Sequence, residues 1–134
     1  MMHKALTLAL VLFFSGCGGE SSQPTVTTSP PKAADEHAAI AALGEINQAQ
    51  KDYFRRYRRY ALGFEELVAE HLLKEEPTAS GYQIRMKPSP DASRYTISAA
   101  PADAPAAGRH LFTDQTGVIH AEQGRDATAD SPAI

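Results

Sequence analysis

The chain has 134 residues, a single cysteine and a formal net charge of −3. This length provides for one domain, and a lone cysteine excludes an intrachain disulfide. The mild acidity argues against general nucleic-acid binding by the chain as a whole. We therefore expect one small domain that is stabilised by a hydrophobic core.

Residues 1–16 have the features of an export signal. Lys4 supplies a basic start, residues 5–14 are apolar except for Thr7, and Ser15 and Gly16 are the small residues before Cys17. Such a run is much shorter than the roughly 20 residues that span a bilayer. The pattern therefore predicts a signal peptide rather than a transmembrane helix.

The sequence Phe-Ser-Gly-Cys at residues 14–17 resembles the bacterial lipobox, which usually has Leu where Phe14 stands. The resemblance implies cleavage before Cys17, a thioether-linked diacylglyceryl group on its sulfur, and acylation (a palmitate-type modification) of the new amino terminus. Several acyl chains anchor a protein stably, whereas one holds it only marginally. Gly18 beside the cysteine implies sorting to the outer membrane in a cell with two membranes. The alternative is an ordinary signal peptide with a chance cysteine.

Residues 17–34 are predicted to be the lipidated cysteine and a flexible linker. The stretch 18–32 is rich in Ser, Thr, Gly and Pro and has almost no large apolar side chains. Such a segment cannot offset the entropy lost on ordering. The globular domain is therefore expected at 35–121, followed by a polar C-terminal tail, 122–134, that is loosely ordered or draped over the sheet.

A long amphipathic helix is predicted over residues 35–60. Asp35 and Glu36 near its start and arginines near its end suit the helix dipole, while Gly44 is a local weakness. We expect the aromatic end of the helix to face the core and the Ala-rich start, 38–43, to be exposed. The apolar stripe has alternating spacings of three and four and comprises Ala39, Leu43, Ile46, Gln50, Tyr53, Tyr57 and Tyr60, widened by Ala42, Ala49 and Phe54.

After Gly63 a short amphipathic helix is predicted over residues 64–73, and the period then changes from helical to two. Alternating residues predict antiparallel strands at 82–86 and 95–99. A second hairpin is predicted from 109–113 and 118–121, around a type I turn with Asp114 first and Gly117 fourth. The resulting fold class is α+β, with a long N-terminal helix packed on a small antiparallel sheet.

The order of several short motifs resembles the globular heads of bacterial type IV pilin-like proteins, especially minor pilins and type II secretion pseudopilins. The motifs are a helix that ends on Tyr and Phe, Leu-Gly-Phe-Glu-Glu-Leu at 62–67, the strand at 95–99, the hairpin at 112–119 and the tail at 126–132. The resemblance extends from about residue 38 to the end of the sequence. It implies a pilin-like head.

One departure from the pilin pattern changes the expected role. Pilins begin with a prepilin cleavage site and a long apolar stalk through which subunits polymerise, and here a lipobox and a linker stand in its place. We therefore expect a lipid-anchored cell-envelope protein with a structural or interaction role, as an accessory to a pilus or type II secretion-type system. No catalytic constellation is found: the sequence has neither a nucleophile elbow nor a phosphate-binding loop, so we expect neither an enzyme nor a cofactor.

Four arginines interleaved with aromatic residues suggest an alternative function, which is binding of extracellular nucleic acid or another polyanion through charge and stacking. Charge runs are more often solvated surfaces, and Asp52 is placed to pair with the first two arginines. We weigh a solvated helix face above a polyanion site, and nucleic acid is not the expected partner. The cluster comprises Arg55, Arg56, Arg58 and Arg59.

Two histidines are candidates for a metal site. A two-residue loop would place His110 and His120 on opposite faces of the hairpin, whereas a bulged turn at Gly117 would pair His120 with Phe112 and place both on one face. Even with Glu122 as a third ligand, this set is small for zinc. The carboxylates of Asp114, Asp126 and Asp130 do not define a calcium loop. No metal site is therefore expected.

Overall fold

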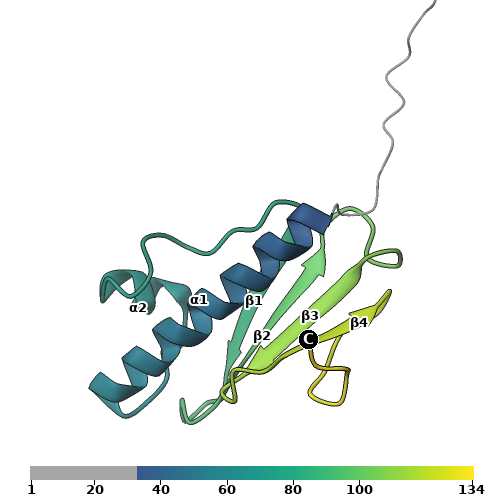
Figure 1. The fold of residues 1–134 in the computed structure, drawn as a ribbon. Helices are drawn as coiled ribbons and strands as arrows, with labels where there is room; N and C mark the ends of the chain where they lie inside the picture. The colour runs from purple at the N-terminus through teal and green to yellow at the C-terminus, as the bar shows by residue number, and fades with distance from the viewer. Residues whose placement is uncertain (1–32) are drawn as a thin grey trace, which may run out of the picture.

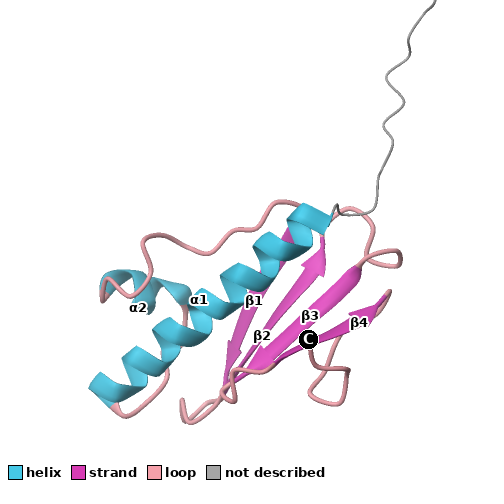
Figure 2. Ribbon diagram, viewed as in Figure 1, coloured by secondary structure: helices cyan, strands magenta, loops and turns pink. Residues whose placement is uncertain are grey.

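A helix layer on one face of an antiparallel sheet makes up the described part of the computed structural model, residues 33–134 (Figures 1 and 2). The predicted α+β fold class is confirmed. The predicted signal peptide, Cys17 and the linker up to residue 32 lie outside the described residues. The elements are α1 (Ala33–Tyr57), α2 (Phe64–Ala69), β1 (Tyr82–Pro88), β2 (Tyr95–Pro101), β3 (Arg109–Asp114) and β4 (Ile119–Gln123).

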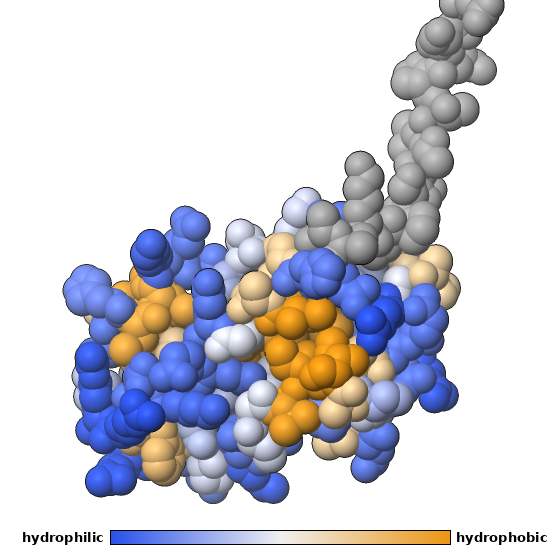
Figure 3. Space-filling view, viewed as in Figure 1, coloured by the Kyte–Doolittle hydropathy of each residue, from blue (hydrophilic) through white to orange (hydrophobic). Residues whose placement is uncertain are grey.

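The strands form a meander in the order β1-β2-β3-β4, with every neighbouring pair antiparallel. Alternate side chains of β2 and β3, including Ile97, Ala99 and Leu111, are fully buried. The opposite sheet face carries polar residues, as expected for a sheet with one face on the core. Figure 3 shows a hydrophobic area beside α1 over β3 and β4, where the helix leaves part of the sheet uncovered.

The tyrosine end of α1 differs from the prediction. The helix ends at Tyr57 rather than Tyr60, because Arg58 adopts a left-handed φ of 59° and its N–H still bonds to the carbonyl of Phe54 at 2.9 Å. Tyr53 is buried, but Tyr57 is 45% exposed. The expectation that Tyr57 belongs to the core was therefore wrong, and Tyr60 and Phe54 pack only at its margin.

The Ala-rich start of α1 contributes to the core, which corrects in part the expectation that residues 38–43 are exposed: of these six residues, Ala38 and Ala41 are exposed and the others are buried or half-buried. Ala39 and Leu43 have no exposed surface at all. Glu36 near the helix start is also paired with Arg109 of β3 at 2.6 Å. In Figure 1 the N-terminal half of α1 crosses the sheet, and its C-terminal end reaches beyond the sheet beside α2. Small side chains suit this close approach of helix to sheet.

A polar network crosses the core between α1 and the sheet. Asn47 donates to the hydroxyl of Thr113 at 2.8 Å and accepts from the hydroxyl of Tyr95 at 2.9 Å. Gln50, fully buried, accepts from the N–H of Ala61 at 2.9 Å and donates to its carbonyl at 3.2 Å. Buried polar groups require such partners. The network thus fixes the position of α1 on the sheet.

The short second helix is shorter than predicted and ends at Ala69 rather than near residue 73. His71 has a left-handed φ of 56°, and its N–H bonds to the carbonyl of Val68 at 3.0 Å. The N–H of Leu72 bonds to the carbonyl of Leu67 at 2.9 Å, which completes a Schellman motif. The chain therefore turns sharply at His71 and continues as an irregular segment to β1.

The C-terminal tail lies along the outer edge of β4. The N–H of Ala121 bonds to the carbonyl of Pro132, and the N–H of Ile134 to the carbonyl of Ile119, each at 2.9 Å. His120 and Ala133 form an isolated antiparallel bridge. A tail that is draped along the sheet, rather than loosely ordered, matches these contacts. The hydrogen bonds from the tail occupy backbone groups of β4 that an edge strand would otherwise expose.

Candidate interaction site

The predicted arginine cluster lies where α1 ends and α2 begins, and most of it is ion-paired. Arg55 contacts Asp52 at 2.7 Å, as expected from the sequence, and Arg56 lies 3.6 Å from Glu70. Arg59 contacts Glu66 at 3.0 Å. Within the part of the chain that is described, only Arg58 of the four has no carboxylate partner. The cluster therefore connects the two helices more than it presents free positive charge.

Glu66 is the centre of this connection. Its Oε2 accepts hydrogen bonds from the Tyr53 hydroxyl at 2.8 Å, from Arg59 at 3.0 Å and from the N–H of Leu62 at 3.3 Å. Burial opposes the charged form of Glu66, but these hydrogen bonds prevail and lower its pKa. Burial, with the contribution of Glu66, raises the pKa of Tyr53 to about 12. The guanidinium of Arg59 also lies over the Tyr53 ring, 5.2 Å from its centroid.

The two histidines share the sheet face opposite α1. His120 pairs with Phe112, so the bulged arrangement of the hairpin is the observed one, and the type I turn is closed by a 2.9 Å bond from Gly117 N–H to the Asp114 carbonyl. His110 lies 3.0 Å from Asp126 and 2.8 Å from the carbonyl of Pro105.

The side-chain contacts of His110 and His120 join the sheet to the loop before β3 and to the segment after β4. His120 lies 2.7 Å from the carbonyl of Ser131 and so holds the tail. Among residues 33–134, no three His, Cys, Asp or Glu side chains are grouped so that they could hold a metal ion. Asp114 instead accepts hydrogen bonds from the N–H and hydroxyl of Thr116 inside the turn.

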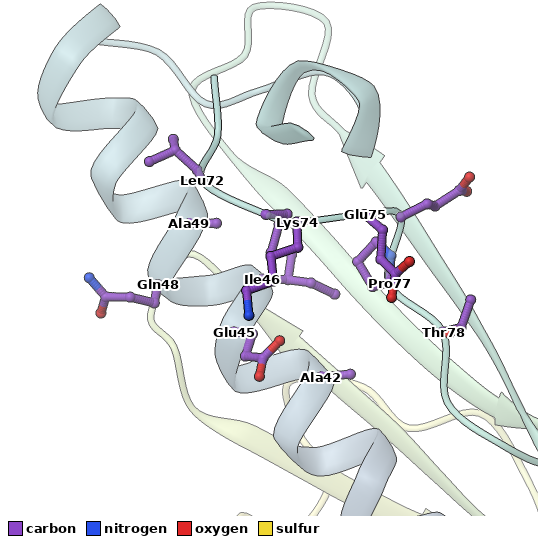
Figure 4. Close-up of a pocket in the computed structure, with 12 residues that line it drawn as sticks. Ala42, Glu45, Ile46, Gln48, Ala49, Leu72, Lys74, Glu75, Pro77 and Thr78 are labelled. Atoms are coloured by element: carbon purple, nitrogen blue, oxygen red, sulfur yellow. The ribbon is translucent and has the colours of Figure 1, made fainter. Parts of the chain in front are cut away.

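An open groove lies between α1 and the segment that follows α2 (Figure 4). It encloses about 440 Å³, a volume within the usual range for binding clefts. Its floor on α1 is formed by Ala42, Ile46 and Ala49, and Leu72 and Pro77 face them from the other wall. The groove exists because the chain turns away at His71, while the two alanines leave space on the helix.

Charged side chains line the rim of this groove. Glu45 of α1 and the three consecutive residues Lys74, Glu75 and Glu76 are all exposed. No ion pair engages any of these four side chains among the described residues. The groove thus combines an apolar floor with a net acidic rim. Such a surface suits a segment of another protein that carries apolar and basic side chains.

The sequence did not indicate this groove, because its two walls are separated by more than twenty residues and its shape depends on the left-handed turn at His71. The apolar stripe of α1 was the available signal, since it includes Ala42, Ile46 and Ala49. Its spacing predicts an apolar helix face but not the groove that this face borders.

Comparison with known proteins finds no match, either to a protein-family model or to a curated sequence. Neither helix in residues 33–134 is both long enough and apolar enough to cross a membrane.

Proposed function

We propose that this chain is a lipid-anchored, pilin-like protein of the bacterial cell envelope whose head binds another protein, as an accessory to a pilus or a type II secretion-type system. The anchor is the acylated Cys17, and the linker that precedes α1 gives the head its reach. The observation that carries the proposal is the groove of Figure 4, an apolar surface with an acidic rim on a helix-and-sheet head.

The pilin resemblance is supported at the level of fold class. A long N-terminal helix lies on an antiparallel sheet, and the first half of that helix contributes Ala39, Leu43 and Ile46 to the core. In a fibre-forming pilin this end would continue into an apolar stalk. A lipid tether in that position favours a single anchored head over a polymerising subunit.

The proposal is tested by genetics and fractionation together. Deleting the gene should impair pilus assembly, secretion or adhesion, and the protein purified from the envelope should carry a pilin or secretion-system component with it. Cys17→Ala should release the protein from the membrane fraction, with Cys17→Ser as a second variant. Unchanged phenotypes together with no co-purified component would refute the accessory role.

Polyanion binding by Arg55, Arg56, Arg58 and Arg59 is the less favoured candidate function, since three of the four are engaged by carboxylates. If it operated, affinity for single-stranded DNA would fall steeply with salt and would disappear when the four arginines are replaced. We expect instead weak binding that is indifferent to the replacement.

A further inference from the structure

A second cleft lies on the sheet face opposite α1, where the β1–β2 turn, the start of β2 and the end of β3 come together. It encloses about 480 Å³. The pairing register places Lys87, Thr96 and Asp114 side by side across β1, β2 and β3. Phe112 of β3 and Ala129 of the C-terminal tail also line this cleft. Three strands, a turn and the tail therefore build one surface.

Two cations in this cleft are unengaged. The side chains of Lys87 and Arg94 are exposed, and in the described part of the chain neither forms an ion pair or a side-chain hydrogen bond. Asp91 in the same turn keeps its negative charge, but its carboxylate accepts hydrogen bonds from Ser89 and Ser93 and, among the described residues, forms no ion pair with Lys87 or Arg94. This contrasts with the arginines at the end of α1, of which three are paired.

The cleft has an apolar side as well. Phe112 is half-buried and its ring centroid lies 6.2 Å from that of His120. Pro88 and Pro90 of the turn and Ala129 of the tail complete this apolar lining. A fitting ligand therefore has a negative group beside an apolar one, because a guanidinium and an ammonium together favour carboxylate or phosphate.

The charge distribution of the protein favours a ligand with few negative charges over a long polyanion. Asp114 lies in the cleft with the two cations, and the whole chain has a net charge of −3. A long polyanion would be repelled by the remainder of the surface, whereas a ligand with one or two charges interacts with Lys87 and Arg94 against the single opposing charge of Asp114 in the cleft lining. A short acidic peptide segment meets this requirement.

We propose that the cleft lined by Lys87, Arg94 and Phe112 binds an acidic peptide segment of a partner protein, with a carboxylate between the two cations and an apolar side chain against Phe112. The cleft is accessible in a tethered head. The N–H of Tyr60 bonds to the carbonyl of Ala92, so the β1–β2 turn lies at the C-terminal end of α1, away from the helix start where the linker joins. The inference deepens the proposed interaction role by naming a second surface and its chemistry.

The test uses the full mature chain in detergent micelles and the peptide Gly-Glu-Phe-Glu-Gly, labelled with a dye at its amino terminus and amidated at its carboxyl terminus so that the two Glu side chains carry its charge, and binding is followed by fluorescence anisotropy. The acidic peptide should bind, and its counterpart with Lys in place of Glu should not. Lys87→Glu and Arg94→Glu should each weaken binding by about tenfold or more. Arg58→Glu and Lys51→Glu are matched controls, since they make the same charge change outside the cleft, and we expect less than about a twofold effect.

Further variants guard against loss of folding. Lys87→Gln and Arg94→Gln remove the charge of an exposed side chain without reversing it, and each should also weaken binding. Circular dichroism of each variant checks that it is folded. No binding by the wild-type protein, equal loss in the Arg58→Glu control, or tighter binding of oligothymidylate than of the peptide would each overturn the inference. Membrane anchoring through Cys17 and co-purification of envelope proteins are measured separately, so failure here is distinguishable from failure of the proposed function.

Discussion

At the scale of single residues, Asn47 has the largest structural role that the sequence did not reveal. It lies next to Ile46 on α1, outside the stripe drawn from apolar spacing, yet it is 4% exposed. A periodicity argument assigns an Asn to the surface, because it cannot show that Thr113 and Tyr95 arrive from two strands to satisfy it. Burial, together with neighbouring negative charge, raises the pKa of Tyr95 and keeps its hydroxyl a donor.

Replacing Asn47 with alanine should destabilise the fold by about 1–3 kcal/mol, because the hydroxyls of Tyr95 and Thr113 lose their shared partner in the core. Urea unfolding of the two proteins measures the difference. The matched control is Gln48→Ala, whose exposed side chain bonds, among residues 33–134, only to Asp52 at 3.1 Å, and for which we expect a loss of no more than about 0.5 kcal/mol. Equal effects in the two variants would contradict the role of the buried network.

The turn residue Asp91 should give stability a measurable pH dependence. Hydrogen bonds from Ser89 and Ser93 lower its pKa to about 2. An ordinary aspartate has a pKa of about 4, so the pKa of Asp91 is lower in the folded protein than in the unfolded chain. The resulting stabilisation is fully present above pH of about 4 and is lost as the pH falls through about 2. Melting temperatures between pH 5 and pH 2 should therefore fall less for Asp91→Asn than for wild type. Parallel profiles would exclude this contribution.

At the scale of elements, α1 shows what periodicity predicts and what it does not. The stripe from Ala39 to Tyr53 was predicted and is buried. Which part of the stripe contacts the sheet depends on the position of the helix along the sheet. The hydrogen bonds of Asn47 and the ion pair between Glu36 and Arg109 fix that position. These contacts are long-range, so aromatic content alone did not reveal that the Ala-rich start also contributes Ala39 and Leu43 to the core.

Gly44 provides a test of the helix itself. A Cβ added at Gly44 meets no atom within 4 Å, so Gly44→Ala should stabilise the protein by about 1 kcal/mol through helix propensity. The contrasting variant is Gly117→Ala, at a φ of +79° with Lys51 Nζ 3.1 Å from the added Cβ, which should destabilise it by about 1 kcal/mol or more. The denaturant midpoints of both variants show whether each substitution raises or lowers the free energy of unfolding. If Gly117→Ala stabilised the protein as Gly44→Ala does, the left-handed conformation at Gly117 would not be the cost that we assign to it.

The strand edges show how the sheet is protected. The outer edge of β4 is occupied by the backbone of residues 132–134. On β1, the outermost strand at the other side, Arg85 and Lys87 are exposed and Pro88 removes a donor. Charged and proline residues on an edge disfavour pairing with another sheet. We therefore expect partners to bind through side-chain surfaces rather than by strand addition.

At the scale of the whole molecule, the change from helical to alternating periodicity was sufficient to predict the α+β class, both hairpins and the bulged pairing as one of two alternatives. The concave surfaces were not predictable. The groove beside α1 depends on a left-handed residue in a short loop, and the cleft behind the sheet depends on Lys87, Arg94 and Phe112, which lie on three separate segments. Local patterns predict elements, whereas sites arise from how distant elements pack.

The measurement that tests the central claim most directly is site-specific photocrosslinking in intact cells. A photoreactive amino acid replaces Glu75 on the rim of the groove, and the matched control carries it at Arg125, an exposed position after β4 that lines neither the groove nor the cleft behind the sheet. The lipid-anchored interaction role predicts one discrete crosslinked envelope protein, a pilin or secretion-system component, from position 75 and none from position 125. No discrete product from position 75, or the same product from both positions, would contradict it.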